Sequence, residues 1–243
     1  MSARQYLPLV LLLATAPCTA QVTVPVNGPH ATSGTVYALT GATLHPAPGE
    51  TIGNGLLVVQ DDKILYAGSP ASGKVPAGAV QVDFSGLHIW PSFVEPWSSA
   101  GIPADKDRKP NERGIGNWNG AIRASTDASA LYAHDKEANA QLRDLGVGTM
   151  LVHRMDGIAR GSGAVIALAE RSRQLDVLKP FASAHFSFRK GTSPDAYPSS
   201  LTGSIALLRQ TLYDVEWYAA ASGVDLRDSE LDAINTQRSG PLF

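Results

Sequence analysis

The sequence from residue 86 to residue 101 constrains the fold more than any other part of this 243-residue chain. It reads GLHIWPSFVEPWSSAG, an apolar run through Ile89, Phe93 and Val94 that turns polar at Glu95. The residues before it predict short β-strands and tight turns, and the residues after it predict alternating strands and helices. Because α/β barrels place their chemistry at the carboxyl ends of their strands, this pattern predicts a barrel strand that ends at a site.

The first twenty residues predict a secretory signal peptide. Arg4 supplies the positive charge, residues 7–16 form an apolar run, and Cys18-Thr19-Ala20 is a small-residue cleavage site. The apolar run is shorter than the roughly 20 residues that cross a bilayer, so no membrane span is expected. We therefore expect export to the periplasm or the extracellular space after cleavage near Ala20. A lipoprotein signal that uses Cys18 is an alternative.

The composition is that of an ordinary globular protein. The formal net charge is -2, with 44% hydrophobic and 17% charged residues. This balance gives no indication of a nucleic-acid partner or of an anionic membrane surface, and it does not predict an oligomeric state. Cys18 is the only cysteine, so a chain cleaved after Ala20 contains none. Cysteine nucleophiles and thiolate zinc sites are thereby excluded.

A small β-rich module, similar to a β-sandwich, is expected at residues 36–88. It follows a linker at residues 21–35 that is rich in Pro, Gly, Thr and Ser. Asp61-Asp62 predicts the turn of a hairpin. The predicted strands are residues 36–44, 56–60, 63–67 and 80–84.

Residues 89–243 predict the first part of a (β/α)8 TIM barrel, which makes the whole chain an α/β protein. After the first barrel strand, a long polar loop at 101–122 is expected over the barrel mouth. The further predicted elements are a helix at 133–145, the second barrel strand at 149–153, an apolar run at 165–169, the third barrel strand at 182–188, and helices at 201–221 and 229–238.

Two details of the helices are predicted from spacing. The helix at 201–221 is expected to bury the stripe formed by Leu201, Ile205, Leu208, Leu212, Val215 and Tyr218. Asp228 is expected to cap the last helix. A complete barrel takes about 250 residues, so the barrel is expected to be incomplete. We expect the amino-terminal part of a longer protein, or the product of a broken gene.

Several segments resemble the amidohydrolase superfamily, the metal-dependent hydrolases that include imidazolonepropionase-like and cyclic-amide enzymes. They are ALTGATL at 38–44, NGLLVVQDDKILYAG at 54–68, PAGAVQVDFSG at 76–86 and WPSFVEPW at 90–97. DGIARGSGA at 156–164 and HFSFRKGTSPDAYPSSL at 185–201 resemble a divergent exported branch of that family. The resemblance implies a composite β-module before a TIM barrel. It also implies hydrolysis of a carbon–nitrogen bond, in a small cyclic or linear amide, by metal-activated water.

The sequence departs from the family pattern at the metal ligands. The first strand of the family usually ends in PGFIDxHxH, in which the two histidines bind the metal. Aligning Val94-Glu95 with Ile-Asp puts Trp97 and Ser99 at the two histidine positions. The resemblance implies a divalent metal, with zinc the expected ion, and places most of its ligands beyond residue 243, so this chain alone would be inactive. The alternative is a catalytically inactive barrel that binds a ligand or a partner.

The candidate site residues are the polar and aromatic side chains near predicted strand ends. Glu95 is the catalytic candidate, as a base or a metal ligand, and the competing interpretation is a surface carboxylate. His153, His185 and Trp97 are candidates for substrate binding, although each could instead be an ordinary structural residue.

The segment Arg160-Gly161-Ser162-Gly163 predicts a tight turn, with backbone N–H groups that could face an anion. Asp135 lies before a predicted helix, where its charge favours the helix start. We interpret both features as structural.

Overall fold

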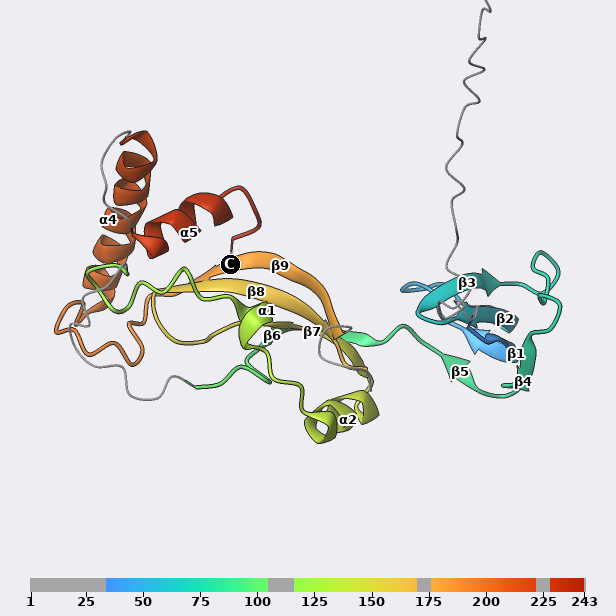
Figure 1. Cartoon of the computed structure of the whole chain (residues 1–243). Coiled ribbons are helices and arrows are strands. Elements are labelled where there is room, and N and C mark those ends of the chain that lie inside the picture. Colours follow the sequence, from blue (N-terminus) through green and yellow to red (C-terminus); the bar gives the residue numbers. More distant parts are fainter. Residues whose placement is uncertain (1–33, 105–115, 170–175, 222–227, 243) are drawn as a thin grey trace, which may run out of the picture. The chain divides into compact units, whose positions relative to one another are not determined.

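The computed structural model describes residues 34–104, 116–169, 176–221 and 228–242 (Figure 1). The predicted signal peptide, nearly all of the predicted linker and the middle of the predicted 101–122 loop lie outside these residues. The chain forms two compact units, residues 1–89 and residues 90–243. In the described ranges no helix has the length and the apolar character needed to cross a membrane.

The first unit contains one five-stranded sheet. Its strands are β1 (Val36–Leu44), β2 (Ile52–Gln60), β3 (Lys63–Gly68), β4 (Val80–Asp83) and β5 (His88–Ile89). The order is β3-β2-β1-β4, and β5 pairs with the far end of β1. β1 is antiparallel to β2 and parallel to β4 and β5. Because β1 has partners along both of its edges, the described residues of the first unit form one continuous sheet. We had predicted a sandwich-like module instead.

The core of this sheet is small, and its turn chemistry is local. Ala38, Leu56 and Val58 are buried together. The β2–β3 hairpin turns at Asp61, whose φ of 54° lies in the left-handed region that Asp tolerates better than most residues. The predicted strands and the predicted hairpin turn are all found, although β2 begins four residues earlier than expected, at Ile52 rather than Leu56.

The second unit is built on a four-stranded sheet with the order β6-β7-β8-β9. Its strands are β6 (Phe93–Ser98), β7 (Val147–Val152), β8 (Ala159–Ala167) and β9 (Val177–Phe186). β6 and β7 are parallel, and β8 is antiparallel to both β7 and β9. Consequently β6, β7 and β9 run in one direction, and their carboxyl ends lie at the same edge of the sheet.

The helices of this unit are α1 (Ala128–Leu131), α2 (Lys136–Asp144), α4 (Leu201–Ala220) and α5 (Ser229–Gln237). α2 lies between β6 and β7 in the sequence, so these elements form the crossover that we predicted for the first two barrel strands. Asp135 caps α2, since its side chain accepts hydrogen bonds from the backbone N–H groups of Glu137 and Ala138. One side of the sheet packs on a core that includes Tyr132, Met150 and Ile166.

The barrel itself is not confirmed. The apolar run within residues 86–101 is not one strand, because His88–Ile89 pairs in the first sheet and Phe93–Ser98 pairs in the second. The predicted third barrel strand lies in β9 and has the expected direction, but β8 separates it from β7.

The predicted tight turn at residues 160–163 is wrong, because this segment is a buried part of β8. Its glycines permit close packing rather than a chain reversal. Gly161 has a φ of 89°, and a Cβ atom there would collide with the backbone carbonyl of Thr126.

The buried face of α4 differs from the predicted stripe. Val215 is buried as expected and Leu208 and Tyr218 are partly buried, but Leu201, Ile205 and Leu212 are exposed. The side chains that α4 buries are Ser204, Leu207, Thr211 and Val215. The helix therefore packs on a face adjacent to the predicted one. Apolar residues occur around much of α4, so its spacing alone did not determine which face packs against α5 and the sheet.

Asp228 caps α5 as predicted, and its removal gives the first test. Its carboxylate accepts hydrogen bonds from the backbone N–H groups of Glu230 and Leu231. We expect Asp228→Ala to lower the free energy of unfolding by about 1 kcal/mol, measured by urea denaturation. The matched control is Glu216→Ala, which removes an exposed acidic residue of α4 and should change stability by less than about 0.5 kcal/mol. Equal effects of the two substitutions would contradict the capping role.

Candidate functional site

Four side chains meet at the edge of the second sheet where β6, β7 and β9 end. Trp97 is the second-last residue of β6, His153 directly follows β7, and His185 is the second-last residue of β9. Arg160 is the second residue of β8, which starts at this edge because it runs the opposite way. The three substrate-binding candidates from the sequence are therefore brought together, and Arg160 joins them.

The three aromatic side chains form one cluster. The rings of His153 and His185 are stacked, with centroids 3.8 Å apart and an interplanar angle of 6°. The Trp97 ring meets them edge-on, 4.3 Å from the His153 centroid and 5.8 Å from that of His185. The two histidines are 0% and 1% exposed, whereas Trp97 is 47% exposed. Trp97 is therefore the part of the cluster that an arriving ligand would meet first.

Hydrogen bonds fix the state of His153. Its Nδ1 lies 2.8 Å from the backbone carbonyl oxygen of Arg154, and because a carbonyl only accepts, Nδ1 carries the proton. In the neutral ring Nε2 is then an acceptor. This Nε2 is buried and has no hydrogen-bond partner among the described residues. His185 is oriented by a different contact, 2.8 Å between its Nε2 and the Ser183 hydroxyl.

Burial and a nearby positive charge keep both histidines neutral. Burial lowers the pKa of His153, and the charge of Arg160 lowers it further, although the hydrogen bond to the Arg154 carbonyl acts in the opposite direction. Burial, together with His153 and the charge of Arg160, lowers the pKa of His185 to about 3. At neutral pH the cluster therefore contains two uncharged imidazoles.

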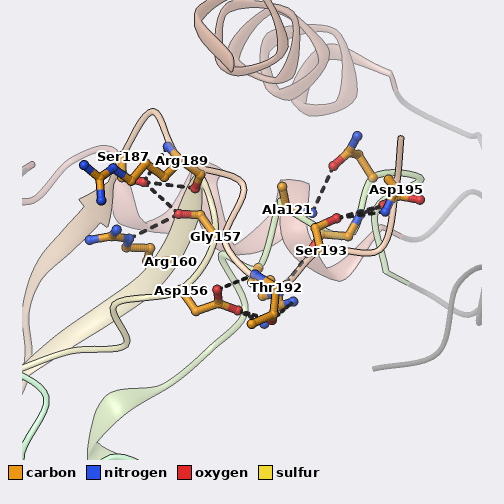
Figure 2. Close-up of polar contacts among 12 residues, drawn as sticks. Ala121, Asp156, Gly157, Arg160, Ser187, Arg189, Thr192, Ser193 and Asp195 are labelled. Carbon is orange, nitrogen blue, oxygen red and sulfur yellow. Dashed lines mark hydrogen bonds and ion pairs between the residues drawn. The ribbon is translucent and has the colours of Figure 1, made fainter. Parts of the chain in front are cut away.

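Arg160 is the charged member of the site, and it is only 8% exposed. Its Nε donates a hydrogen bond of 3.1 Å to the carbonyl oxygen of Gly157, which Figure 2 shows. Its Cζ lies 6.0 Å from the centre of the Trp97 ring, at the outer limit of a cation–π contact. Burial lowers the pKa of this guanidinium, but an arginine side chain in a protein stays charged at neutral pH.

Asp156 is the carboxylate nearest to this arginine in the sequence, and it is engaged elsewhere. It forms an ion pair of 2.6 Å with Nη1 of Arg123 and accepts hydrogen bonds of 2.7 Å from the backbone N–H and the hydroxyl of Thr192 (Figure 2). These hydrogen bonds and the charge of Arg123 outweigh the effect of burial and lower the pKa of Asp156. Asp156 is therefore ionised, and it links the loop that carries Arg123 to the loop that carries Thr192.

Glu95 has a local partner in the structure. Its Oε1 accepts a 2.9 Å hydrogen bond from the backbone N–H of Trp97, so the carboxylate supports the end of β6 that carries this ring. Ser99, at the second of the two positions where the family has histidines, is exposed just beyond β6. Neither residue adds a metal-binding nitrogen to the cluster.

The described residues do not form the metal site that the family resemblance implies. Across those residues, no three His, Cys, Asp or Glu side chains are grouped so that they could hold an ion. The stacked histidines are also unsuited to sharing one, because a ring nitrogen binds a metal in the plane of its ring and two parallel rings direct their lone pairs side by side.

Sequence reasoning missed the roles of Arg160 and Gly163 because it placed both residues in a turn. A Cβ atom on Gly163 would lie 2.5 Å from Nε2 of His185, so the absence of a side chain there makes room for the ring. A glycine inside a strand often marks such a close approach, but this signal could be used only once the segment was assigned to a strand.

Comparisons with known proteins identify a similar fold among solved structures. No family model and no curated protein matches the sequence. Among solved structures, the chain is similar to an amidohydrolase from Thermotoga maritima MSB8, with a TM-score of 0.62 and 19% identity. The chain has an amidohydrolase-like fold. The match covers 85% of this chain but only 57% of that one, and at this identity it shows the fold alone.

Shorter matches are found to two other hydrolases. A putative prolidase from Bifidobacterium longum is 20% identical over 29% of this chain and 18% of its own, with a TM-score of 0.25. The ochratoxinase of A. niger is 21% identical over 32% of this chain and 18% of its own, with a TM-score of 0.23. These two likenesses are too limited to support an argument about function.

Proposed function

We propose that this chain is part of an amidohydrolase that hydrolyses a non-peptide carbon–nitrogen bond in a small cyclic or linear amide. In this proposal Trp97, His153, His185 and Arg160 bind the substrate. The observation that carries the proposal is their convergence at the carboxyl ends of three strands that run in one direction. α/β folds bind ligands at this edge, where the loops that follow the strands meet.

The side chains at this edge are suited to holding an amide in a fixed orientation. The free Nε2 lone pair of His153 can accept a hydrogen bond from an amide N–H. Trp97, which is 47% exposed, provides a flat apolar surface that excludes water from one side of a planar amide. These residues therefore bind and orient the substrate, which is the part of catalysis that positioning supplies.

Several further features belong to the same proposal. The family resemblance leads us to propose a divalent metal, with zinc the expected ion and most of its ligands in a longer form of the protein. Glu95 is retained as a catalytic candidate because it lies in β6 and its carboxylate accepts a hydrogen bond from the backbone N–H of Trp97. From the pattern of residues 1–20 we also propose export, with the mature chain beginning near Gln21.

Metal analysis and an amide panel test the proposal on the full-length protein. Elemental analysis should find a stoichiometric divalent metal in that form. Mass spectrometry should detect hydrolysis of at least one member of a panel of hydantoin, dihydrouracil and N-acetylglycine. Metal-free protein that hydrolyses no member of the panel would contradict it.

A single substitution then links the activity to this site. His153→Phe keeps a stacked ring but removes the Nε2 acceptor, and we expect it to lower kcat/KM about 10-fold or more. The matched control is His88→Phe, which changes an exposed histidine of the first unit and should leave kcat/KM unchanged. Full activity of a folded His153→Phe protein would remove His153 from the site.

The second candidate function is a catalytically inactive amidohydrolase-fold protein that binds a ligand or a partner. The specific observation in its favour is the pair Trp97 and Ser99 at the positions where the family carries metal-binding histidines. Ligand binding that changes tryptophan fluorescence, in a full-length protein without metal and without turnover, would favour this candidate over the hydrolase.

A further inference from the structure

Arg160 is a buried positive charge for which the described part of the chain supplies no negative partner. It is 8% exposed, and none of the carboxylates in that part forms an ion pair with it. Within the described residues, its Nε donates a hydrogen bond to a neutral carbonyl, that of Gly157. Buried charges in proteins are normally paired, because a cation removed from water is otherwise strongly destabilised. An uncompensated guanidinium at a site edge therefore indicates a ligand that brings the negative charge.

The surroundings of Arg160 increase the positive potential. Asp156 is the carboxylate whose charge acts on Arg160, but it forms its ion pair with Arg123. Its negative charge is therefore balanced by Arg123 rather than by Arg160. Arg189 adds a further positive charge that acts on Arg160. The two stacked histidines carry no charge at neutral pH, so they neither satisfy the guanidinium nor repel it strongly. The site as a whole therefore favours an anion.

The geometry around Arg160 also limits what kind of anion fits. The half-exposed ring of Trp97 lies next to the guanidinium and also contacts the ring of His153, whose Nε2 is buried and has no hydrogen-bond partner among the described residues. A ligand that bridges these groups needs a negative group for Arg160, a planar part for Trp97 and a hydrogen-bond donor for Nε2. A carboxylate attached to an amide supplies all three.

We propose that Arg160 binds a carboxylate of the substrate, so that the substrate class is an amide that carries a carboxylate, such as an N-acyl amino acid. This inference rests on the proposed function and adds the substrate's charge to it. A guanidinium matches a carboxylate with two parallel hydrogen bonds, which gives orientation as well as affinity. Binding at this point would set the amide nitrogen close to His153.

The decisive comparison uses two ligands that differ only in charge. N-acetylglycine carries the carboxylate, and N-acetylglycinamide replaces it with a neutral group of nearly the same shape. Binding to the full-length protein is measured by calorimetry and by tryptophan fluorescence. We expect N-acetylglycine to bind about 10- to 100-fold more tightly, the range for losing a charge-assisted hydrogen-bonded pair. Equal affinities would overturn the inference.

Variants of Arg160 tie this preference to the residue. Arg160→Gln should abolish the preference for N-acetylglycine, and Arg160→Lys should restore only part of it, because an ammonium lacks the two-pronged geometry. The matched control is Lys179→Gln, which removes an exposed positive charge near the start of β9 and should keep the preference. Circular dichroism verifies that each variant is folded. The comparison of the two ligands on the unmodified protein needs no variant and holds even if Arg160→Gln does not fold.

The outcomes separate this inference from the proposed function. Carboxylate-selective binding that Arg160→Gln removes, in a protein that hydrolyses no amide, would support the inference and contradict the hydrolase. Hydrolysis of the charged and the neutral ligand with equal kcat/KM would support the hydrolase and overturn the inference. Inorganic phosphate that binds as tightly as N-acetylglycine would also overturn it, since Arg160 would then bind anions in general.

Discussion

Gly163→Ala is expected to lower the free energy of unfolding by about 2–3 kcal/mol, at the upper end of the cost of overpacking a protein core. The new Cβ atom would lie 2.5 Å from Nε2 of His185 and 3.0 Å from the Ser183 hydroxyl. The His185 ring cannot move away cheaply, because it is stacked on His153 and bonded to Ser183. The substitution should therefore disturb the candidate site as well as the fold.

Urea denaturation measures the stability loss, and the NMR signals of the histidine rings report the displacement. Gly53→Ala is the matched control, because a Cβ atom at Gly53 meets nothing within 4 Å. That control should be close to neutral. If Gly163→Ala is as stable as the control and leaves the ring signals unchanged, then β8 does not pack closely against the histidine pair at Gly163.

Acidification is expected to destabilise the second unit through the same histidines. Folding lowers the pKa of His185 from its unfolded value of about 6.5 to about 3. Between these two values the unfolded chain binds a proton that the folded chain does not, so the free energy of unfolding falls as the pH falls. The contribution is fully present above about pH 6.5 and is lost progressively down to about pH 3. His153, whose pKa is also lowered, acts in the same direction.

The expected size is up to about 1.4 kcal/mol per pH unit for one histidine, or about 2 kcal/mol between pH 6.5 and pH 5. Urea denaturation at pH 7.5 and pH 5 measures this loss of stability. Comparison with a variant that lacks the histidine subtracts the contribution of the other titrating groups. His185→Phe keeps an aromatic ring in the stack but cannot bind a proton, so its stability should fall less between the two pH values. The same fall in the parent protein and in His185→Phe would show that His185 is not held neutral by the fold.

Local sequence patterns were sufficient for much of the fold. The strand at 36–44, the turn at Asp61 and the Asp228-capped helix follow from alternation, turn chemistry and capping, which act within a few residues. β8 was only partly found because its first half is rich in glycine and lacks the β-branched residues that favour strands. Pairing with β9 and single bridges to Ile122 and Asp127 hold this segment extended, and such long-range pairing is not visible in a local window.

The candidate site shows the same division between local and long-range information. Trp97, His153 and His185 were found because each is near the end of a predicted strand, and strands that run in one direction bring their ends together. Arg160 was missed because its strand was interpreted as a turn. Glu95 was predicted to be a catalytic residue. Its position in the sequence did not reveal that its carboxylate accepts a hydrogen bond from the backbone N–H of Trp97, two residues away.

The central claim is that the edge formed by Trp97, His153, Arg160 and His185 binds an amide substrate. A crystal structure of the full-length protein with N-acetylglycine tests it most directly. We predict carboxylate oxygens within hydrogen-bond distance of the Arg160 guanidinium, the planar amide against Trp97, and its N–H directed at Nε2 of His153. N-acetylglycine bound at another place, with this edge free of it, would contradict the claim.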